Sequence, residues 1–197
     1  GAFYLETLSE NYHFAPVLAV AWTQGDQAYA TSGQVAFASS AFRKWLEDAS
    51  LPKISADLKR DSILLDHQGQ VLSRAQILDH VTFDVGLAAY LVDVEKIKDL
   101  ASLATYLDLG IQVQLDEAVY GKGVKQALPE NERLAQHLAD KVSLLDQAVA
   151  PLNQQLDDLG MTQLYQDMEF PLAQVLTDME KRGVAVDVAT LDQMNDL

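Results

Sequence analysis

The sequence contains no cysteine, and basic residues are scarce in it. Without cysteine the chain has neither a disulfide framework nor a thiolate metal site. It also lacks any run of about 18 uncharged apolar residues, which a membrane-spanning helix requires. The 14 basic residues stand against 29 acidic ones, which gives a net charge of −15 and a pI of about 4.4.

This charge bears directly on nucleic acid binding. Affinity for nucleic acids comes largely from lysine and arginine side chains that release counterions from phosphates. We therefore expect the chain by itself to bind DNA weakly or not at all. What the sequence does contain is 49% apolar residues over 197 positions, enough for one sizeable core and an appendage.

The apolar pattern predicts an α/β or α+β fold, with a small mixed sheet flanked by helices and a helical extension at the C-terminal end. Short β-rich runs at 2–7, 15–23 and 27–31 predict an antiparallel meander. A further strand is expected at 52–56, and a loop at 115–128. Helical spacing predicts helices over 37–48, 57–66, 84–92, 99–109, 129–159 and 162–182.

Several residues mark the expected helix ends. Asp84 and Asp99 precede apolar helical runs and are predicted N-caps. Gly160 is expected to end the long helix, and Pro151 is a position where that helix can bend.

Common catalytic motifs are missing. The sequence has no G-x-G-x-x-G and no G-x-x-x-x-G-K-[ST] pattern, and GKGVK at 121–125 is too short for a phosphate-binding loop. The four histidines are scattered without metal-ligand spacing, so each is expected to be an ordinary surface or core residue: His13, His67, His80 and His137.

The most specific pattern lies near the end of the chain, where residues 168–187 read MEFPLAQVLTDMEKRGVAVD. It fills every fixed position of E-x-P-L-x-x-V-L-x-x-M-E-x-x-G-V-x-V-D and so resembles the start of the polymerase domain in bacterial DNA polymerase I. A generic amphipathic helix would explain the apolar stripe but not Pro171 or the G-V-x-V-D exit. DEAVYGKGVK at 116–125 resembles family members whose 3′–5′ exonuclease domain has decayed.

The resemblance implies a ribonuclease H-like, 3′–5′ exonuclease-like domain over 1–160 and a truncated start of the polymerase domain over 161–197. The implied parent is a cytoplasmic DNA-directed DNA polymerase, a nucleotidyltransferase of replication and repair that uses Mg2+ or Mn2+. The implied partners are the polymerase domain of the same chain and, through the parent, DNA. For this piece alone we expect no cofactor.

In intact members of the family, four carboxylates hold two divalent metal ions. Tyr4 and Glu6 match the D-x-E positions on the first strand, so at most one of those two acids survives even if the register slips. Asp61 matches the metal-binding aspartate of N-L-K-Y-D, which reads DLKRD here. The alternative for Asp61 is an exposed acid on an amphipathic helix. The remnant ligands are thus Glu6 and Asp61, weak at best.

On the long helix, His137 and Lys141 match the Y-x-x-x-D positions. A shift of one residue would offer Gln136 and Asp140 instead, but it rotates the acid about 100° off the inward face, so Lys141 is preferred. Its ammonium repels a metal ion and is expected to pair with Asp61 or Glu6.

Because the family mechanism needs both metals, we expect a catalytically inactive domain with a structural role. Two alternatives stay open. One is a weakly active, metal-dependent exonuclease rebuilt with Asp57 or Asp140. The other is an acidic protein-interaction module.

Overall fold

The computed structural model describes residues 1–8, 16–67 and 81–169. Its first three strands form the predicted antiparallel meander, with β1 (Phe3–Glu6) beside β2 (Ala19–Gln24) and β2 beside β3 (Gln27–Ser32). Two further strands, β4 (Lys53–Ser55) and β5 (Val81–Asp84), pair in parallel. An isolated parallel bridge between Ala2 and Ile54 connects the three-stranded sheet to the two-stranded one, and this mixed arrangement confirms the predicted fold class.

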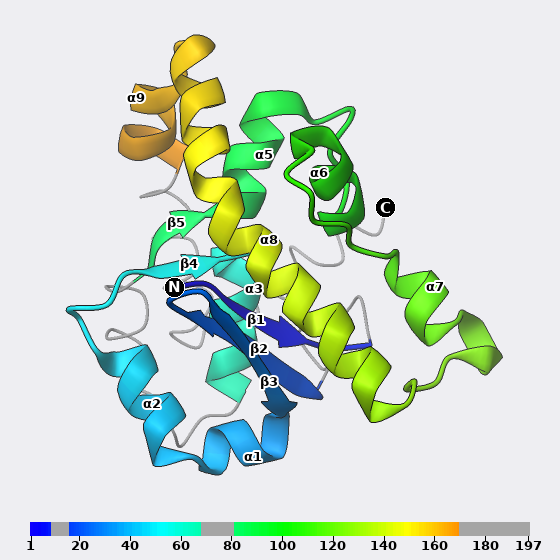
Figure 1. Cartoon of the computed structure of the whole chain (residues 1–197). Helices are drawn as coiled ribbons and strands as arrows, with labels where there is room; N and C mark the ends of the chain where they lie inside the picture. Colours follow the sequence, from blue (N-terminus) through cyan, green and yellow to red (C-terminus); the bar gives the residue numbers. More distant parts are fainter. Residues whose placement is uncertain (9–15, 68–80, 170–197) are drawn as a thin grey trace, which may run out of the picture.

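Helices cover both faces of this sheet (Figure 1). In the described part they are α1 (Gly33–Ala38), α2 (Ser40–Glu47), α3 (Leu58–His67), α5 (Val85–Asp93), α6 (Leu100–Leu107), α7 (Asp116–Tyr120), the 3-10 turn η1 (Gly123–Lys125), α8 (Asn131–Asp158), α9 (Thr162–Leu164) and the π-helical η2 (Tyr165–Glu169). None of the described helices has the length and apolar character needed to cross a membrane.

The side chains of β1 alternate between two apolar cores because successive residues of a strand point to opposite faces. Phe3 and Leu5 pack with the aromatic residues of α2 and with α3. Ala2 and Tyr4 pack toward α5, α6 and the long helix α8, which runs across that face of the sheet (Figure 1). Full burial of one leucine side chain contributes about 1.5–3 kcal/mol, so the buried leucines of α8 hold this helix firmly: Leu138, Leu144, Leu145, Leu152 and Leu156.

Both predicted N-caps are confirmed. Asp84 Oδ1 accepts a hydrogen bond from the backbone N–H of Leu87 at 3.0 Å. Asp99 Oδ1 accepts one from the backbone N–H of Ser102 at 2.7 Å. Gly160, with φ of 69°, follows the end of α8 in the left-handed conformation that favours glycine.

Three details differ from the sequence-based expectation. The predicted helix over 37–48 is divided at Ser39, whose side chain accepts from the N–H of Phe42 and so starts α2 as a separate helix. Residues 81–84 form the strand β5, which was not predicted. The expected loop over 115–128 contains α7 and η1.

The last described segment is attached to β5. Tyr165 is buried against Phe83, with ring centroids 5.4 Å apart. Its hydroxyl accepts from the N–H of Asp84 at 2.9 Å and donates to the C=O of the same residue at 3.3 Å. Most of the polymerase-like motif, and with it the rest of the predicted helix over 162–182, lies outside the described residues.

Candidate active site

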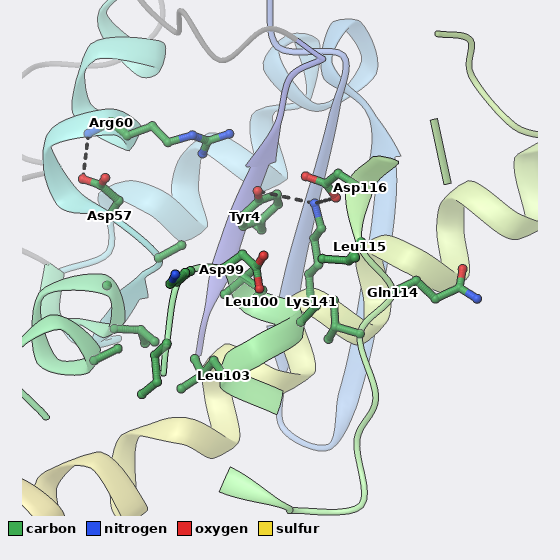
Figure 2. A pocket seen from close by; sticks show the side chains of 18 of the residues that line it. Tyr4, Asp57, Arg60, Asp99, Leu100, Leu103, Gln114, Leu115, Asp116 and Lys141 are labelled. Carbon is green, nitrogen blue, oxygen red and sulfur yellow. Dashed lines mark hydrogen bonds and ion pairs between the residues drawn. The ribbon is translucent and has the colours of Figure 1, made fainter. Parts of the chain in front are cut away.

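Tyr4 and Glu6 lie on the same face of β1, as expected for alternate residues of a strand. Tyr4 is 8% exposed and Glu6 is 1% exposed. Lys141 reaches them from α8, and Asp116 reaches them from the start of α7. Figure 2 shows Tyr4, Asp116 and Lys141 pointing toward one another, with Arg60 approaching Tyr4 from the other side.

The ammonium of Lys141 bridges two carboxylates. Its Nζ lies 2.6 Å from Glu6 Oε2 and 2.7 Å from Asp116 Oδ1. It also donates to the hydroxyl of Tyr4 at 3.5 Å and lies 4.6 Å from the centre of the Tyr4 ring. Lys141 is 2% exposed whereas Asp116 is 55% exposed, so this pair connects the protein interior to the surface.

Two further side chains complete this cluster. His137 Nε2 lies 2.8 Å from Asp116 Oδ1, and the hydroxyl of Tyr120 donates to Glu6 Oε2 at 2.9 Å. The rings of Tyr120 and His137 meet edge to face, 5.6 Å apart. Both ends of α7 are therefore hydrogen bonded to the cluster.

Asp61 has different partners. Its Oδ1 lies 3.1 Å from Arg60 Nη1, and its Oδ2 accepts from the hydroxyl of Ser55 at 2.6 Å. Arg60 also donates to the C=O of Leu5 at 2.8 Å. Asp61 is only 1% exposed, which excludes the alternative of an exposed acid. Of the two partners expected for Lys141, the structure pairs it with Glu6.

The charges of this cluster support one another. Desolvation by itself would lower the pKa of Lys141, but the Tyr4 hydroxyl and the carboxylates of Glu6 and Asp116 raise it above its ordinary value. Partial burial works against ionisation of Asp116, yet its hydrogen bond with His137 and the charge of Lys141 lower its pKa to about 2. At neutral pH the buried lysine therefore stays charged and bound to an ionised Asp116.

In two other buried acids the pKa is raised and not lowered. Burial raises the pKa of Asp61 to about 6, against the opposing effects of the Arg60 charge and the Ser55 hydrogen bond. Burial and the charge of Asp57 raise the pKa of Asp84 to about 7. Asp84 caps α5 and also accepts from the N–H of Leu58 at 3.1 Å, so its carboxylate holds the first turns of two helices.

The two acids considered as substitute ligands have hydrogen-bond partners outside the Lys141 cluster. Asp57 is exposed, and its carboxylate accepts from the backbone N–H of Arg60 at 3.1 Å. Asp140 accepts from the side chain of Gln136 at 2.8 Å on the exposed side of α8.

Two neighbouring cavities, of about 620 and 690 Å3, flank the cluster and share Tyr4, Arg60, Asp116 and Glu117 in their walls. The first is lined mainly by α5, α6 and the segment before α7, and the second by the end of β1 and the segment around Gly121. The ion-paired side chains thus lie between two cavities.

Sequence reasoning missed three members of this arrangement, namely Arg60, Asp116 and Tyr120. Each lies inside a stretch that carried the resemblance, DLKRD at 57–61 or DEAVYGKGVK at 116–125. The presence of a charged or hydroxyl-bearing side chain within such a motif could have indicated these residues. The neighbouring sequence does not show, however, that their side chains reach the cluster around Glu6 and Lys141.

The donor set does not fit a two-metal centre as it stands. Among the described residues, Glu6, Asp116 and His137 have ligand atoms within 4.8 Å of one another, and Asp61 is not part of that group. Lys141 Nζ is already bonded to two of these three side chains. The cation that these oxygens bind in the structure is therefore the ammonium of Lys141.

Comparison with known proteins identifies related chains. The family described as DNA polymerase I, ribonuclease H-like domain, matches residues 3–148. DNA polymerase I of Bacillus subtilis (strain 168) is 35% identical over 196 residues, which is 99% of this chain and 22% of that protein. DNA polymerase I of Streptococcus pneumoniae (strain ATCC BAA-255 / R6) is 36% identical over 192 residues, 98% of this chain and 21% of that protein.

Solved structures show the same fold. Brucella melitensis NrnC superposes with a TM-score of 0.69 at 21% identity, over 93% of this chain and 86% of that one. The POL domain of Pol1 from M. smegmatis, in complex with DNA primer-template and dNTP, superposes with a TM-score of 0.65 at 20% identity, over 91% of this chain and 28% of that one. This chain spans about a fifth of the length of the curated relatives it matches. It belongs to the bacterial DNA polymerase I family, as its ribonuclease H-like, 3′–5′ exonuclease-like domain.

Proposed function

We propose that this domain has no 3′–5′ exonuclease activity and serves as a structural module of a DNA polymerase I. The observation that carries the proposal is the position of Lys141, whose ammonium lies within 2.7 Å of both Glu6 and Asp116. A side chain that belongs to the fold thus neutralises carboxylates that a metal ion would need.

The two-metal mechanism requires one ion to activate the attacking water and both ions to stabilise the charge on the phosphate. A divalent ion about 4 Å from a lysine ammonium would be repelled by about 8 kcal/mol at an effective dielectric constant of 20, twice the value for two unit charges. This repulsion is large enough to exclude an ion bound by only a few oxygens. Arg60 beside Asp61 opposes a second ion in the same way.

The activity of the whole protein is proposed from its relatives, which are DNA polymerase I enzymes. The parent of this domain would extend DNA from deoxynucleoside triphosphates with Mg2+ or Mn2+ in the cytoplasm, in replication and repair. The partners of the domain would be the polymerase domain, starting near residue 161, and DNA held elsewhere in the parent. The net charge of −15 supports the proposal that DNA is held elsewhere in the parent, because an acidic surface repels phosphates. Family membership also favours this context over an acidic protein-interaction module.

The test is degradation of a 3′-labelled single-stranded oligonucleotide, first with Mg2+ and then with Mn2+. The natural protein is compared with Asp61→Ala, purified in parallel to measure contaminating nuclease. We expect the two proteins to release label at the same background rate with either metal. Release that depends on Asp61 would refute the proposal.

The same assay addresses the alternative of a weakly active nuclease with a substitute ligand. Cleavage by the natural protein in Mn2+ that disappears in Asp57→Ala or Asp140→Ala would identify a rebuilt site. The hydrogen bonds of these two acids with the Arg60 backbone and with Gln136 argue against that role.

A further inference from the structure

The surroundings of Lys141 Nζ are those of a bound cation. Two carboxylate oxygens contact the ammonium at 2.6 and 2.7 Å. One of these oxygens also lies 2.8 Å from the imidazole Nε2 of His137. The ligand atoms of Glu6, Asp116 and His137 all lie within 4.8 Å of one another. The side chain of Lys141 thus ends where three metal-ligating side chains converge.

We propose that Glu6, Asp116 and His137 form a transition-metal site, that the ammonium of Lys141 fills it in the natural sequence, and that Asp61 has no part in it. The proposal rests on the proposed function in one respect, since both take Lys141 to occupy a metal position. It differs from the ligand set implied by the family resemblance, which includes Asp61 and assigns no metal contact to Asp116 or His137.

The chemistry of the donors selects the class of metal. One imidazole nitrogen and two carboxylate oxygens suit Zn2+ and Co2+, whereas Mg2+ prefers an octahedral set of oxygens. Bonds of about 2.0–2.2 Å to such an ion bring ligand atoms to about 4 Å or less from one another. The widest separation, at most 4.8 Å, needs only a small contraction, and the 2.8 Å between Asp116 Oδ1 and His137 Nε2 needs a small opening. Both are adjustments of the position of Asp116, which can move because it is half exposed at the first position of the five-residue helix α7.

The ligands are already oriented by other groups. Glu6 Oε1 accepts from the backbone N–H of Thr7 at 3.1 Å, and its Oε2 accepts from the Tyr120 hydroxyl at 2.9 Å. His137 is 4% exposed on α8. Hydrogen bonds to ligating side chains fix their orientation and strengthen metal binding, so Glu6 needs little further ordering when an ion enters.

Asp61 is held away from this set by its own partners. The guanidinium of Arg60 and the hydroxyl of Ser55 bind its two oxygens. The site is thus divided into two halves, each neutralised by a different protein cation. A metal ion that replaces Lys141 should leave the half around Arg60 unchanged.

The experiment replaces the occupant without changing the ligands. Lys141→Met keeps an unbranched side chain and removes the charge. Co2+ is titrated into this variant and into the natural protein, and binding is followed by visible absorption, which reports nitrogen and oxygen ligation. We expect Lys141→Met to bind Co2+ at least about tenfold more tightly than the natural protein, and Zn2+ to displace the Co2+ spectrum. Mg2+ should not.

Two matched double variants locate the ligands. Lys141→Met with His137→Gln should lose the gained affinity and the Co2+ spectrum, whereas Lys141→Met with Asp61→Asn should keep both. Binding that requires Asp61 but not His137 would overturn the proposal in favour of the ligand set that the family implies. Equal Co2+ affinity of Lys141→Met and the natural protein would overturn it as well.

Loss of folding in Lys141→Met does not block the test. Circular dichroism of this variant, and of Lys141→Gln as a second substitution, is then recorded with and without Zn2+. Recovery of helical signal on addition of Zn2+ supports the site, and failure to recover contradicts it. The nuclease assay on the natural protein stands apart from these measurements, so the proposed function and the metal site can fail independently.

Discussion

The buried pair of Lys141 and Glu6 allows a quantitative prediction of stability. Lys141→Met removes the ammonium and leaves the carboxylate of Glu6, 1% exposed, without a cation. Loss of one partner of a buried ion pair costs about 3–5 kcal/mol, because the other charge stays buried and uncompensated. Asp116, which is 55% exposed, can be solvated instead and should add little. For a chain of this length the loss corresponds to a fall in Tm of about 6–20 °C.

A double-mutant cycle separates this charge effect from a simple loss of packing. Glu6→Gln combined with Lys141→Met leaves neither member of the buried pair charged. We expect this double variant to be at least about 2 kcal/mol more stable than the sum of the two single effects predicts. The assay is equilibrium unfolding in urea with EDTA present, followed by tryptophan fluorescence. Trp45 is buried against Phe3 of β1 and reports the core.

A surface pair provides the control for this cycle. Lys96 Nζ lies 4.0 Å from Asp93 Oδ2, and its side chain is 73% exposed. Lys96→Met should change the free energy of unfolding by less than about 0.5 kcal/mol. A loss below about 1 kcal/mol in Lys141→Met, or additive effects in the cycle, would refute the view that this ion pair stabilises the site.

Three other substitutions test individual groups. The pKa of Asp84 is raised to about 7 in the folded protein, well above its unfolded value near 3.9, so its stabilising contribution is complete below about pH 4 and is lost as the pH rises through 7. Asp84→Asn should flatten the pH dependence of unfolding between pH 4 and 7, and an unchanged slope in urea titrations across that range would contradict the raised pKa. Among the described residues the hydroxyl of Ser62 is the buried side-chain polar atom without a hydrogen-bond partner, so Ser62→Ala should leave the urea midpoint unchanged or raise stability by up to about 1 kcal/mol; a clear loss would indicate a missed partner. Tyr165→Phe removes the hydroxyl that accepts from the N–H of Asp84. It should lower the free energy of unfolding by about 1–3 kcal/mol in the same urea titration. An unchanged free energy of unfolding would contradict this prediction.

Local interactions were readable from the sequence because both partners lie within a few positions of each other. The N-caps at Asp84 and Asp99 each bind an amide three residues further on, and the alternation on β1 follows from strand geometry alone. The motifs at 116–125 and 168–187 indicated the family, which the match over residues 3–148 shows. The sequence by itself thus determined the fold class and the family, and it led to the prediction that Lys141 stands where the family has a ligand aspartate.

The partners in the site were decided only by the tertiary structure. Lys141 and Glu6 are 135 positions apart, and Tyr120 and Glu6 are 114 apart. No local pattern ranks Glu6 above Asp61 as the partner of Lys141, because the choice depends on how α3, α7 and α8 pack against β1. Arg60 neutralises Asp61 from the adjacent position, while Asp116 reaches Lys141 from α7. Electrostatic pairing in a buried site is set by distances of a few ångströms, and only packing of distant segments establishes those distances.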